Sequence, residues 1–142
     1  GAPCSRCCGP SPGCEPLTNA EWLDAQQLWP GLDRRDVCKE AVEDPAYNCI
    51  AWTLDNTAEW IWDEVDVDHN GLWEYTDLEA FFALYQKSAI LYGGNNTAVL
   101  HTAMPLPNNC ASSKAGEWIR MRHDRNQIEG GYYGDILGTH AY

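Results

Sequence analysis

The sequence predicts an α+β domain in which helices pack on a small antiparallel sheet. Helix signals dominate the first half of the 142-residue chain, beginning with a capping box from Thr18 to Glu21. After Ser88 the pattern changes to alternating apolar residues separated by turn residues, which is typical of strands. Helices followed by strands favour the α+β class. A 44% apolar content with seven Trp and seven Tyr indicates a packed globule rather than a disordered segment.

The first half of the chain predicts two helices and one ambiguous segment. The first helix should cover residues 19–29, because Pro30-Gly31 ends it. Residues 33–41, which carry Cys38, form a second, polar helix or a loop. Asp44-Pro45 forces an extended approach to a buried helix that begins near Cys49, with Asn48 as its N-cap.

The second half predicts strands. Residues 89–92 and 97–104 flank the turn sequence Gly93-Gly94-Asn95-Asn96, which is typical of a hairpin. Residues 117–123 alternate, with Ile119, Met121 and His123 on one face. A last strand covers residues 134–141.

Composition sets the domain organisation and excludes several partners. The chain is long enough for one domain, 1–142, with a Cys/Pro-rich head over residues 1–16. A net charge of −12 argues against nucleic acid and anionic membranes, whose phosphates repel it. No apolar run approaches the roughly 20 residues that a spanning helix needs. We expect a monomer.

Seven cysteines in a short chain favour an oxidising compartment and a secreted, extracellular protein. Four of them lie within the first fourteen residues, in a Pro/Gly-rich stretch that needs disulfides to hold it. The sequon Asn95-Asn96-Thr97 fits secretion. An odd count leaves at least one thiol without an intramolecular partner. The pairing of the others cannot be derived, because six cysteines allow fifteen connectivities.

The segment 66–77, with the sequence DVDHNGLWEYTD, has the spacing of a calcium loop. Calcium takes six to eight oxygen ligands, which alternate residues of a tight loop supply. The expected ligands are Asp66, Asp68 and Asn70 at positions one, three and five, the Leu72 carbonyl at seven, Glu74 at nine and Asp77 at twelve. Gly71 stands sixth, where a left-handed backbone is needed. The alternative is an acidic solvated turn before a helix.

This segment resembles the EF-hand loop, since it matches D-x-[DN]-x-[DN]-G. Asp77 replaces the usual Glu at position twelve and is followed by Leu78, as in dockerin repeats, although dockerins carry two copies and this chain shows one. A shorter twelfth ligand implies weak binding, roughly 10⁻⁴–10⁻³ M. We treat residues 60–86 as an inserted calcium loop and helix.

Cys49 and two histidines form a second candidate site. A helix N-terminus at Cys49 would favour the thiolate and lower its pKa. A nucleophilic thiol needs a base from elsewhere in the sequence. His101 and His123 stand on apolar faces of predicted strands, and we expect both to face the sheet side that holds the Cys49 helix.

The stretches YNCIAW, AVLHTA, SKAGEWIRMRH and GGYYGDIL resemble small domains of the NlpC/P60 or amidase-like branch of papain-type cysteine hydrolases. The likeness covers residues 45–137 and implies a papain/NlpC-P60-like core. It makes Cys49 the nucleophile, His101 the base and His123 the group that orients His101. Asn48 or Tyr47 would assist the Cys49 amide at the oxyanion. Peptide or cell-wall amides are the substrates that it implies.

Other interpretations remain open for the same residues. Cys49 is alternatively a bridging cysteine or a buried inert thiol. A zinc site of Cys49, His101 and His123 matches no short metal motif. The tryptophans are either core residues or a sugar-binding platform. The alternative function is a non-catalytic secreted binding module or effector, in which calcium and disulfides hold a binding surface.

Overall fold

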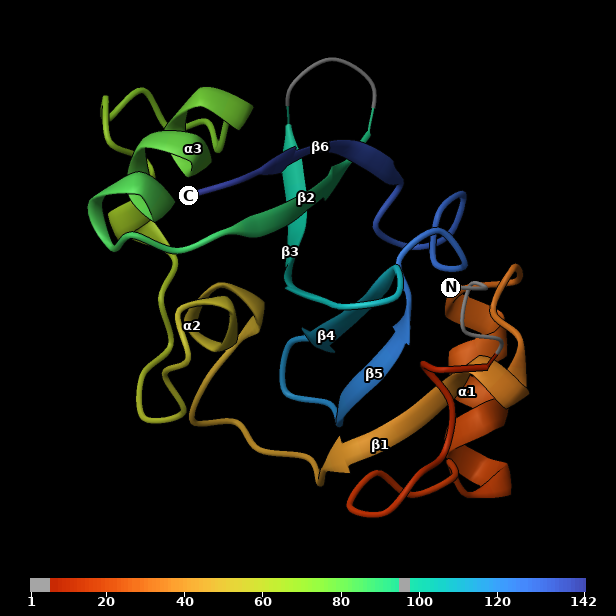
Figure 1. Cartoon of the computed structure of the whole chain (residues 1–142). Coiled ribbons are helices and arrows are strands. Elements are labelled where there is room, and N and C mark those ends of the chain that lie inside the picture. The colour runs from red at the N-terminus through yellow and green to blue at the C-terminus, as the bar shows by residue number, and fades with distance from the viewer. Residues whose placement is uncertain (1–5, 95–97) are drawn as a thin grey trace.

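The computed structural model describes residues 6–94 and 98–142, and it confirms the α+β class. Figure 1 shows α1 on one side of a twisted sheet and α2 and α3 on the other. The helices are α1 (Asn19–Leu28), α2 (Cys49–Thr53) and α3 (Tyr75–Leu84), with 3₁₀ turns η1 (Arg34–Asp36) and η2 (Asp63–Val65). The strands are β1 (Val37–Ala41), β2 (Ala89–Gly93), β3 (Val99–Leu106), β4 (Cys110–Lys114), β5 (Arg120–Asp124) and β6 (Asp135–His140).

The six strands form one antiparallel sheet in the order β1-β5-β4-β3-β2-β6. Successive residues of a strand point to opposite faces, so the sheet separates two apolar clusters. One cluster takes Ile90 and Tyr92 from β2 and packs them against Trp29, the residue that caps the C-terminal end of α1. The other takes Ala89 and Leu91 and packs them against α2 and α3. The helices therefore cover both faces.

The helix predictions are largely confirmed. Thr18 caps α1 with both hydrogen bonds of the capping box to Glu21, and Asn48 caps α2 by accepting from the Ala51 amide at 3.2 Å. Helix α3 follows the loop as expected and buries Leu78, Phe81 and Phe82. These elements form where a local capping residue and a local apolar face coincide.

The prediction of a polar helix or loop over residues 33–41 is wrong in its second half. After the short turn η1, Val37–Ala41 is strand β1, which pairs with β5. Val37 and Cys38 are fully buried there, and Cys38 forms a disulfide with Cys14. The long-range partner β5 and this crosslink override a segment whose own sequence is polar.

The strand predictions are confirmed for β2, β3, β5 and β6, but β4 is missed. The hairpin turn and the sequon at 95–97 lie partly or wholly outside the described residues. In β5, Met121 and His123 are completely buried while Arg120 and Arg122 are partly exposed, as the alternation predicts. The polar sequence CASSK of β4 is buried throughout in the middle of the sheet.

Disulfides tie the Cys-rich head to the sheet. Cys8 bonds to Cys110 of β4 and Cys14 to Cys38 of β1, and Cys7 is also disulfide-bonded. These bonds indicate folding in an oxidising environment. Cys4 lies outside the described residues. In the ranges 6–94 and 98–142, no helix combines the length and apolar character needed to cross a bilayer.

Candidate functional site

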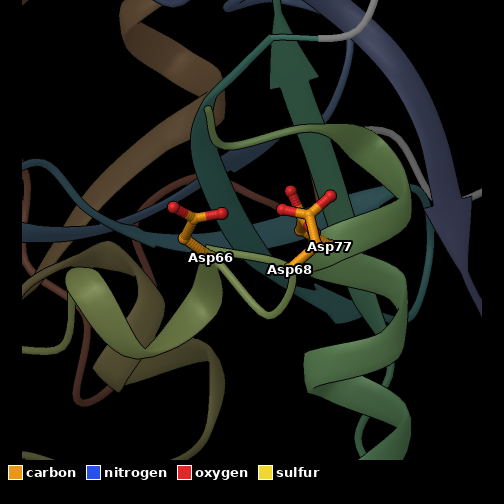
Figure 2. Close-up of side chains that lie close together, drawn as sticks. All are labelled: Asp66, Asp68 and Asp77. Atoms are coloured by element: carbon orange, nitrogen blue, oxygen red, sulfur yellow. The ribbon is translucent and has the colours of Figure 1, made fainter. Parts of the chain in front are cut away.

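The acidic loop brings three of its predicted ligands together. Asp66 and Asp68 come from the loop and Asp77 from the first turn of α3, and one oxygen of each lies within 4.8 Å of the others. Figure 2 shows the three carboxylates gathered over the loop. Asp66 and Asp77 are buried and Asp68 is exposed.

Backbone geometry holds the carboxylates in this arrangement. The amide of Gly71 donates to Asp66 at 2.8 Å, and the amide of Asn70 donates to both Asp66 and Asp68 at 3.3 Å. His69 and Gly71 have positive φ angles of 57° and 80°, which turn the chain tightly around the aspartates. The loop conformation is therefore fixed by the same residues that the calcium pattern singles out.

The electrostatics of the cluster favour a cation. Desolvation, a hydrogen bond to Asp66 and the charges of Asp77 and Asp66 raise the pKa of Asp68. Two oxygens on opposite sides of one calcium ion lie about 5 Å apart, since Ca–O distances are about 2.3–2.6 Å. The 4.8 Å spread of the three carboxylates therefore fits ligands of a single ion.

The other predicted ligands have local partners in this structure. Glu74 accepts from the Asn70 side-chain amide at 2.5 Å and forms a capping box with Asp77 at the start of α3. The Asn70 side-chain oxygen accepts from the Leu72 amide at 2.9 Å. Asp66, Asp68 and Asp77 thus form the assembled part of the site, while Asn70 and Glu74 brace the loop.

Cys49 is the free cysteine among the described residues and is buried at the start of α2. Its carbonyl oxygen accepts from Thr53 at 2.8 Å and from Thr102 of β3 at 3.2 Å, so α2 is fixed to the sheet at this residue. The interpretation of Cys49 as a bridging cysteine is wrong, because no disulfide involves it.

A hydrogen-bonded chain connects the two predicted histidines through a residue that the sequence did not single out. His101 Nε2 lies 3.0 Å from Ser113 Oγ, which lies 2.7 Å from His123 Nε2. His123 Nδ1 lies 2.8 Å from the carbonyl oxygen of Asp124. Ser113 of β4 therefore stands between the base and its predicted orienting residue.

The expectation that both histidines face the Cys49 helix is wrong. His101 pairs across the sheet with Tyr92, and His123 pairs with Val37 and Ala111. These partners belong to the cluster under α1, whereas Cys49 belongs to the cluster under α2 and α3. Directly paired residues share a face of the sheet, so the imidazoles project towards the α1 side.

The thiol and the imidazole still border a common space. Cys49 and His101 both line a small cavity beside Thr102. It lies at the N-terminal end of β3, where the pairing with β4 does not extend beyond Met104. No hydrogen bond joins Cys49 to His101 in the described parts of the chain. His101 Nδ1 is buried and has no hydrogen-bond partner among them.

Both groups are held in their neutral forms. Burial raises the pKa of the Cys49 thiol, although hydrogen bonds from Thr102 and the amides of Ile50 and Cys49 oppose the rise. This reverses the lowered pKa expected at a helix N-terminus, because desolvation outweighs those hydrogen bonds. Burial, with the nearby His123 charge, lowers the pKa of His101 to about 3, and burial lowers that of His123 to about 4.

A larger, mainly apolar cavity of about 480 Å³ opens beside Cys49. Trp60, Trp62, Leu100 and Tyr132 line it and are 42–67% exposed. Among the described residues no charged side chain lines this cavity, although the chain carries a net charge of −12. An uncharged group fits the cavity better than an ionic one.

The acidic loop and this cavity share a wall. The Trp62 and Trp73 rings lie 5.1 Å apart, and Trp73 donates from its indole nitrogen to the Trp62 carbonyl at 2.9 Å. Trp73 is the eighth residue of the loop, and its carbonyl accepts from the Val99 amide at the start of β3. The loop conformation therefore positions Trp62 at the mouth of the cavity.

The predicted oxyanion residues serve structural roles. Asn48 lines the cavity, but its side chain accepts from Ala51 and donates to the Ile61 carbonyl at 2.6 Å. Tyr47 is buried, with its hydroxyl 3.4 Å from Arg120 and its ring against the Lys114 ammonium. No hydrogen bond joins either side chain to Cys49 in the described residues.

Sequence reasoning missed Ser113, Lys114 and Tyr133. Lys114 is fully buried and donates to the carbonyl oxygens of Asp44, Tyr47 and Gly116 at 2.5–3.1 Å. Tyr133 stacks on His101 at 4.1 Å with an interplanar angle of 8°. The dipeptide Ser113-Lys114 inside an otherwise weak strand pattern was the available signal.

Comparison with known proteins identifies a family without a known function. Residues 39–140 match the model of a domain of unknown function, DUF7689. The match includes Cys49, the acidic loop and both histidines but not the head or α1. No curated protein and no solved structure matches the chain. Because the matched segment is more than half of the 142 residues, the chain belongs to the DUF7689 family.

Proposed function

We propose that this protein is a secreted calcium-binding cysteine hydrolase, in which the 66–77 loop binds the ion and Cys49 is the nucleophile. Calcium binding has the stronger geometric support. The observation that carries it is the gathering of Asp66, Asp68 and Asp77 within 4.8 Å, against their mutual repulsion. Hard oxygen ligands in a tight loop suit calcium rather than zinc or copper.

Thermal and urea unfolding with chelator and with added calcium test the ion site. Ligand that binds the folded state alone stabilises it by RT ln(1+[L]/Kd), about 2.7 kcal/mol at a hundredfold excess over Kd. Asp68→Asn should abolish this response, because Asn has nearly the same shape as Asp but lacks the negative charge of the ligand. Asp24→Asn, in the exposed part of α1, is the matched control and should keep it.

Indifference of unfolding to both chelator and millimolar calcium would sink the calcium proposal. A response that survives Asp68→Asn would place the ion elsewhere on the acidic surface.

The hydrolase proposal is supported by Cys49 and its surroundings. A free thiol borders an uncharged cavity of about 480 Å³, and a buried imidazole with an unpartnered Nδ1 borders the adjoining small cavity. In the proposed step Cys49 Sγ attacks an amide carbonyl carbon, His101 accepts the thiol proton, and the same proton goes to the leaving nitrogen as the C–N bond breaks. The papain/NlpC-P60-like core belongs to this proposal.

No hydrogen bond joins Cys49 to His101 in the described residues, so in this proposal the thiol and the imidazole meet when substrate is bound. Substrate that fills the aromatic mouth at Trp60, Trp62 and Tyr132 would exclude water and bring the pair into contact. We infer a peptide or cell-wall-type amide with an uncharged, apolar group beside the scissile carbonyl, because no charged side chain in the described part of the chain lines the cavity.

An electrophilic peptide probe tests this site in the intact, unreduced protein. A peptidyl fluoromethyl ketone with Phe next to the reactive carbonyl should alkylate Cys49, and the same probe with Asp should react at least tenfold more slowly. Cys49→Ser should abolish labelling. His101→Gln keeps the thiol and should slow it by about 10²–10⁴-fold, the usual contribution of a general base.

The alternative is a non-catalytic secreted module whose aromatic mouth is a binding surface. The raised pKa of Cys49 and the absence of a Cys49–His101 hydrogen bond in the described residues favour it. Labelling of Cys49 at the same rate with the Phe and Asp probes, or equal labelling of His101→Gln, would support the module over the enzyme.

A further inference from the structure

The hydrogen bonds that connect His101, through Ser113 and His123, to Asp124 can run in one direction only, because the acceptor atoms determine which group donates. These bonds cross three neighbouring strands, from β3 through β4 to β5, with donor–acceptor distances of 3.0, 2.7 and 2.8 Å. His101, Ser113 and His123 are all at most 1% exposed. Water therefore does not compete for these hydrogen bonds, and each hydrogen atom must have a definite place.

The Asp124 carbonyl fixes the first hydrogen atom. A carbonyl oxygen only accepts, so His123 Nδ1 must carry the hydrogen. The His123 ring is neutral near pH 7, because burial lowers its pKa to about 4. Its Nε2 then has a lone pair and accepts from the Ser113 hydroxyl.

The Ser113 hydroxyl fixes the position of the second hydrogen atom, the one on His101. Its single hydrogen is donated to His123, so its oxygen accepts from His101 Nε2, which must therefore carry a hydrogen. The His101 ring is also neutral, because its pKa falls to about 3. The lone pair of His101 is then on Nδ1, the atom that has no hydrogen-bond partner among the described residues.

Aromatic packing holds the His101 ring in this orientation. Tyr133 stacks on it at 4.1 Å, nearly parallel, and Tyr92 lies 5.6 Å away at a tilt of 50°. Tyr92 is itself anchored, because its hydroxyl donates to the Arg125 carbonyl at 2.8 Å. A flip of the imidazole that exchanged its two nitrogens would break the bond to Ser113 inside a packed stack.

We propose that Ser113 is a positioning residue that fixes His101 as the Nε2–H tautomer and so keeps Nδ1 as the free base. The tautomer follows from the directions of the hydrogen bonds between neutral rings, while its use in accepting the Cys49 proton rests on the proposed hydrolase function. A His101 fixed as the other tautomer would present a hydrogen at Nδ1 and could not accept a proton there.

Long-range ¹H–¹⁵N spectra of the full, histidine-labelled protein at pH 7 test the tautomers directly. We expect two buried neutral histidines: His101 with hydrogen on Nε2 alone and His123 with hydrogen on Nδ1 alone, distinguished by contacts of the His101 ring protons with Tyr133. A His101 ring with hydrogen on Nδ1, or one charged at pH 7, would overturn the proposal.

Substitutions of Ser113 identify the residue responsible. Ser113→Ala should convert His101 to a mixture of tautomers, and Ser113→Thr, which keeps the hydroxyl, should restore a single one. Ser112→Ala is the matched control: its hydroxyl bonds to Trp52 and Glu40 instead, so it should leave His101 unchanged. An unaltered single tautomer in Ser113→Ala refutes the role of Ser113.

The measurement still tests the tautomer of His101 if Ser113→Ala does not fold, because the wild-type spectrum reports it, and Ser113→Thr then tests whether a hydroxyl at position 113 keeps it. It is also separable from the proposed function. If His101 shows the expected tautomer but the peptide probe never labels Cys49, this inference stands and the hydrolase proposal is refuted. If the probe labels Cys49 but His101 shows the other tautomer, the hydrolase proposal stands and this inference is refuted.

Discussion

The acidic loop and the polar centre of the sheet are held together in opposite ways. The polar centre consists of the buried residues His101, Ser113, Lys114 and His123. In the loop, the hydrogen bonds that shape Asp66, Asp68 and Asp77 join residues two to five positions apart. Around β4, Ser113 reaches His101 and His123 across 12 and 10 positions, and Lys114 reaches Asp44 and Tyr47 across 70 and 67. The loop is thus specified locally, whereas the centre exists only once the whole sheet has formed.

The covalent link between head and β4 should give the largest effect on this comparison. The Cys8–Cys110 bond closes 102 residues, and replacing both cysteines with Ser should cost about 4–5 kcal/mol by the chain-entropy estimate. Urea unfolding measures the loss. The Cys14–Cys38 bond closes only 24 residues and should cost less when removed. The reverse order would show that loop length does not decide these costs.

The buried ammonium of Lys114 should come next. Lys114→Met removes the donor shared by three carbonyl oxygens, which should lower the free energy of unfolding by about 3–5 kcal/mol, because each buried acceptor left without a donor costs about 1–3 kcal/mol. Lys87→Met, at an exposed position, is the control and should change it little. A loss below 1 kcal/mol for Lys114→Met would mean that those carbonyls find other donors.

Acid should weaken the centre before it weakens the loop. His101 and His123 have pKa values of about 3 and about 4 in the folded protein, below the unfolded value of roughly 6.5. The unfolded state binds more protons between these limits, so stability falls as pH drops below about 6.5 and continues to fall to about 3, the folded pKa of His101. From pH 7 to 5 we expect a loss of about 4 kcal/mol, about 2 kcal/mol for each histidine.

Urea unfolding at pH 7, 6 and 5 measures this loss. His69→Gln alters an exposed histidine of the loop and should leave the pH dependence unchanged. Stability that is constant from pH 7 to 5 would contradict the burial of two neutral imidazoles.

The smallest effect should come from the backbone of the loop. Gly71 has a φ of +80° and open space where a Cβ would lie, so Gly71→Ala should cost only the left-handed conformation, roughly 1 kcal/mol. It should also weaken the proposed calcium binding by deforming the turn around Asp66. Gly94→Ala, also in open space but without a positive φ, is the control. Equal losses of stability from the two variants would show that the positive φ of Gly71 is not the cause of the cost.

The same contrast explains which features the sequence could predict. The capping box of α1 and the N-cap Asn48 depend on neighbours within a few residues, and both are found where their patterns indicated. The loop likewise gathers Asp66, Asp68 and Asp77, three of the six residues that its spacing singled out. The ion itself, like the activity of Cys49, stays a prediction.

Strands β1 and β4 were missed because their polar residues are stabilised by distant partners. Ser112 bonds to Glu40 and Trp52, and Ser113 to the two histidines. No window of local sequence contains both members of such pairs. The predicted face of His101 and His123 was wrong for the same reason. Alternation shows which residues of one strand share a face of the sheet, but only the position of α2 shows which of the two faces the Cys49 helix covers.

The adjacency of Ser113 and Lys114 also constrains how β4 can align with its neighbours. Because consecutive strand residues point to opposite faces, slippage by a single residue would bring the ammonium among the aromatic rings of Tyr92 and Tyr133 and leave the carbonyls of Asp44 and Tyr47 to a hydroxyl too short to span them. Misaligned sheets are thereby penalised on both sides at once. Ser113 and Lys114 together therefore specify the register of β4 in the sheet.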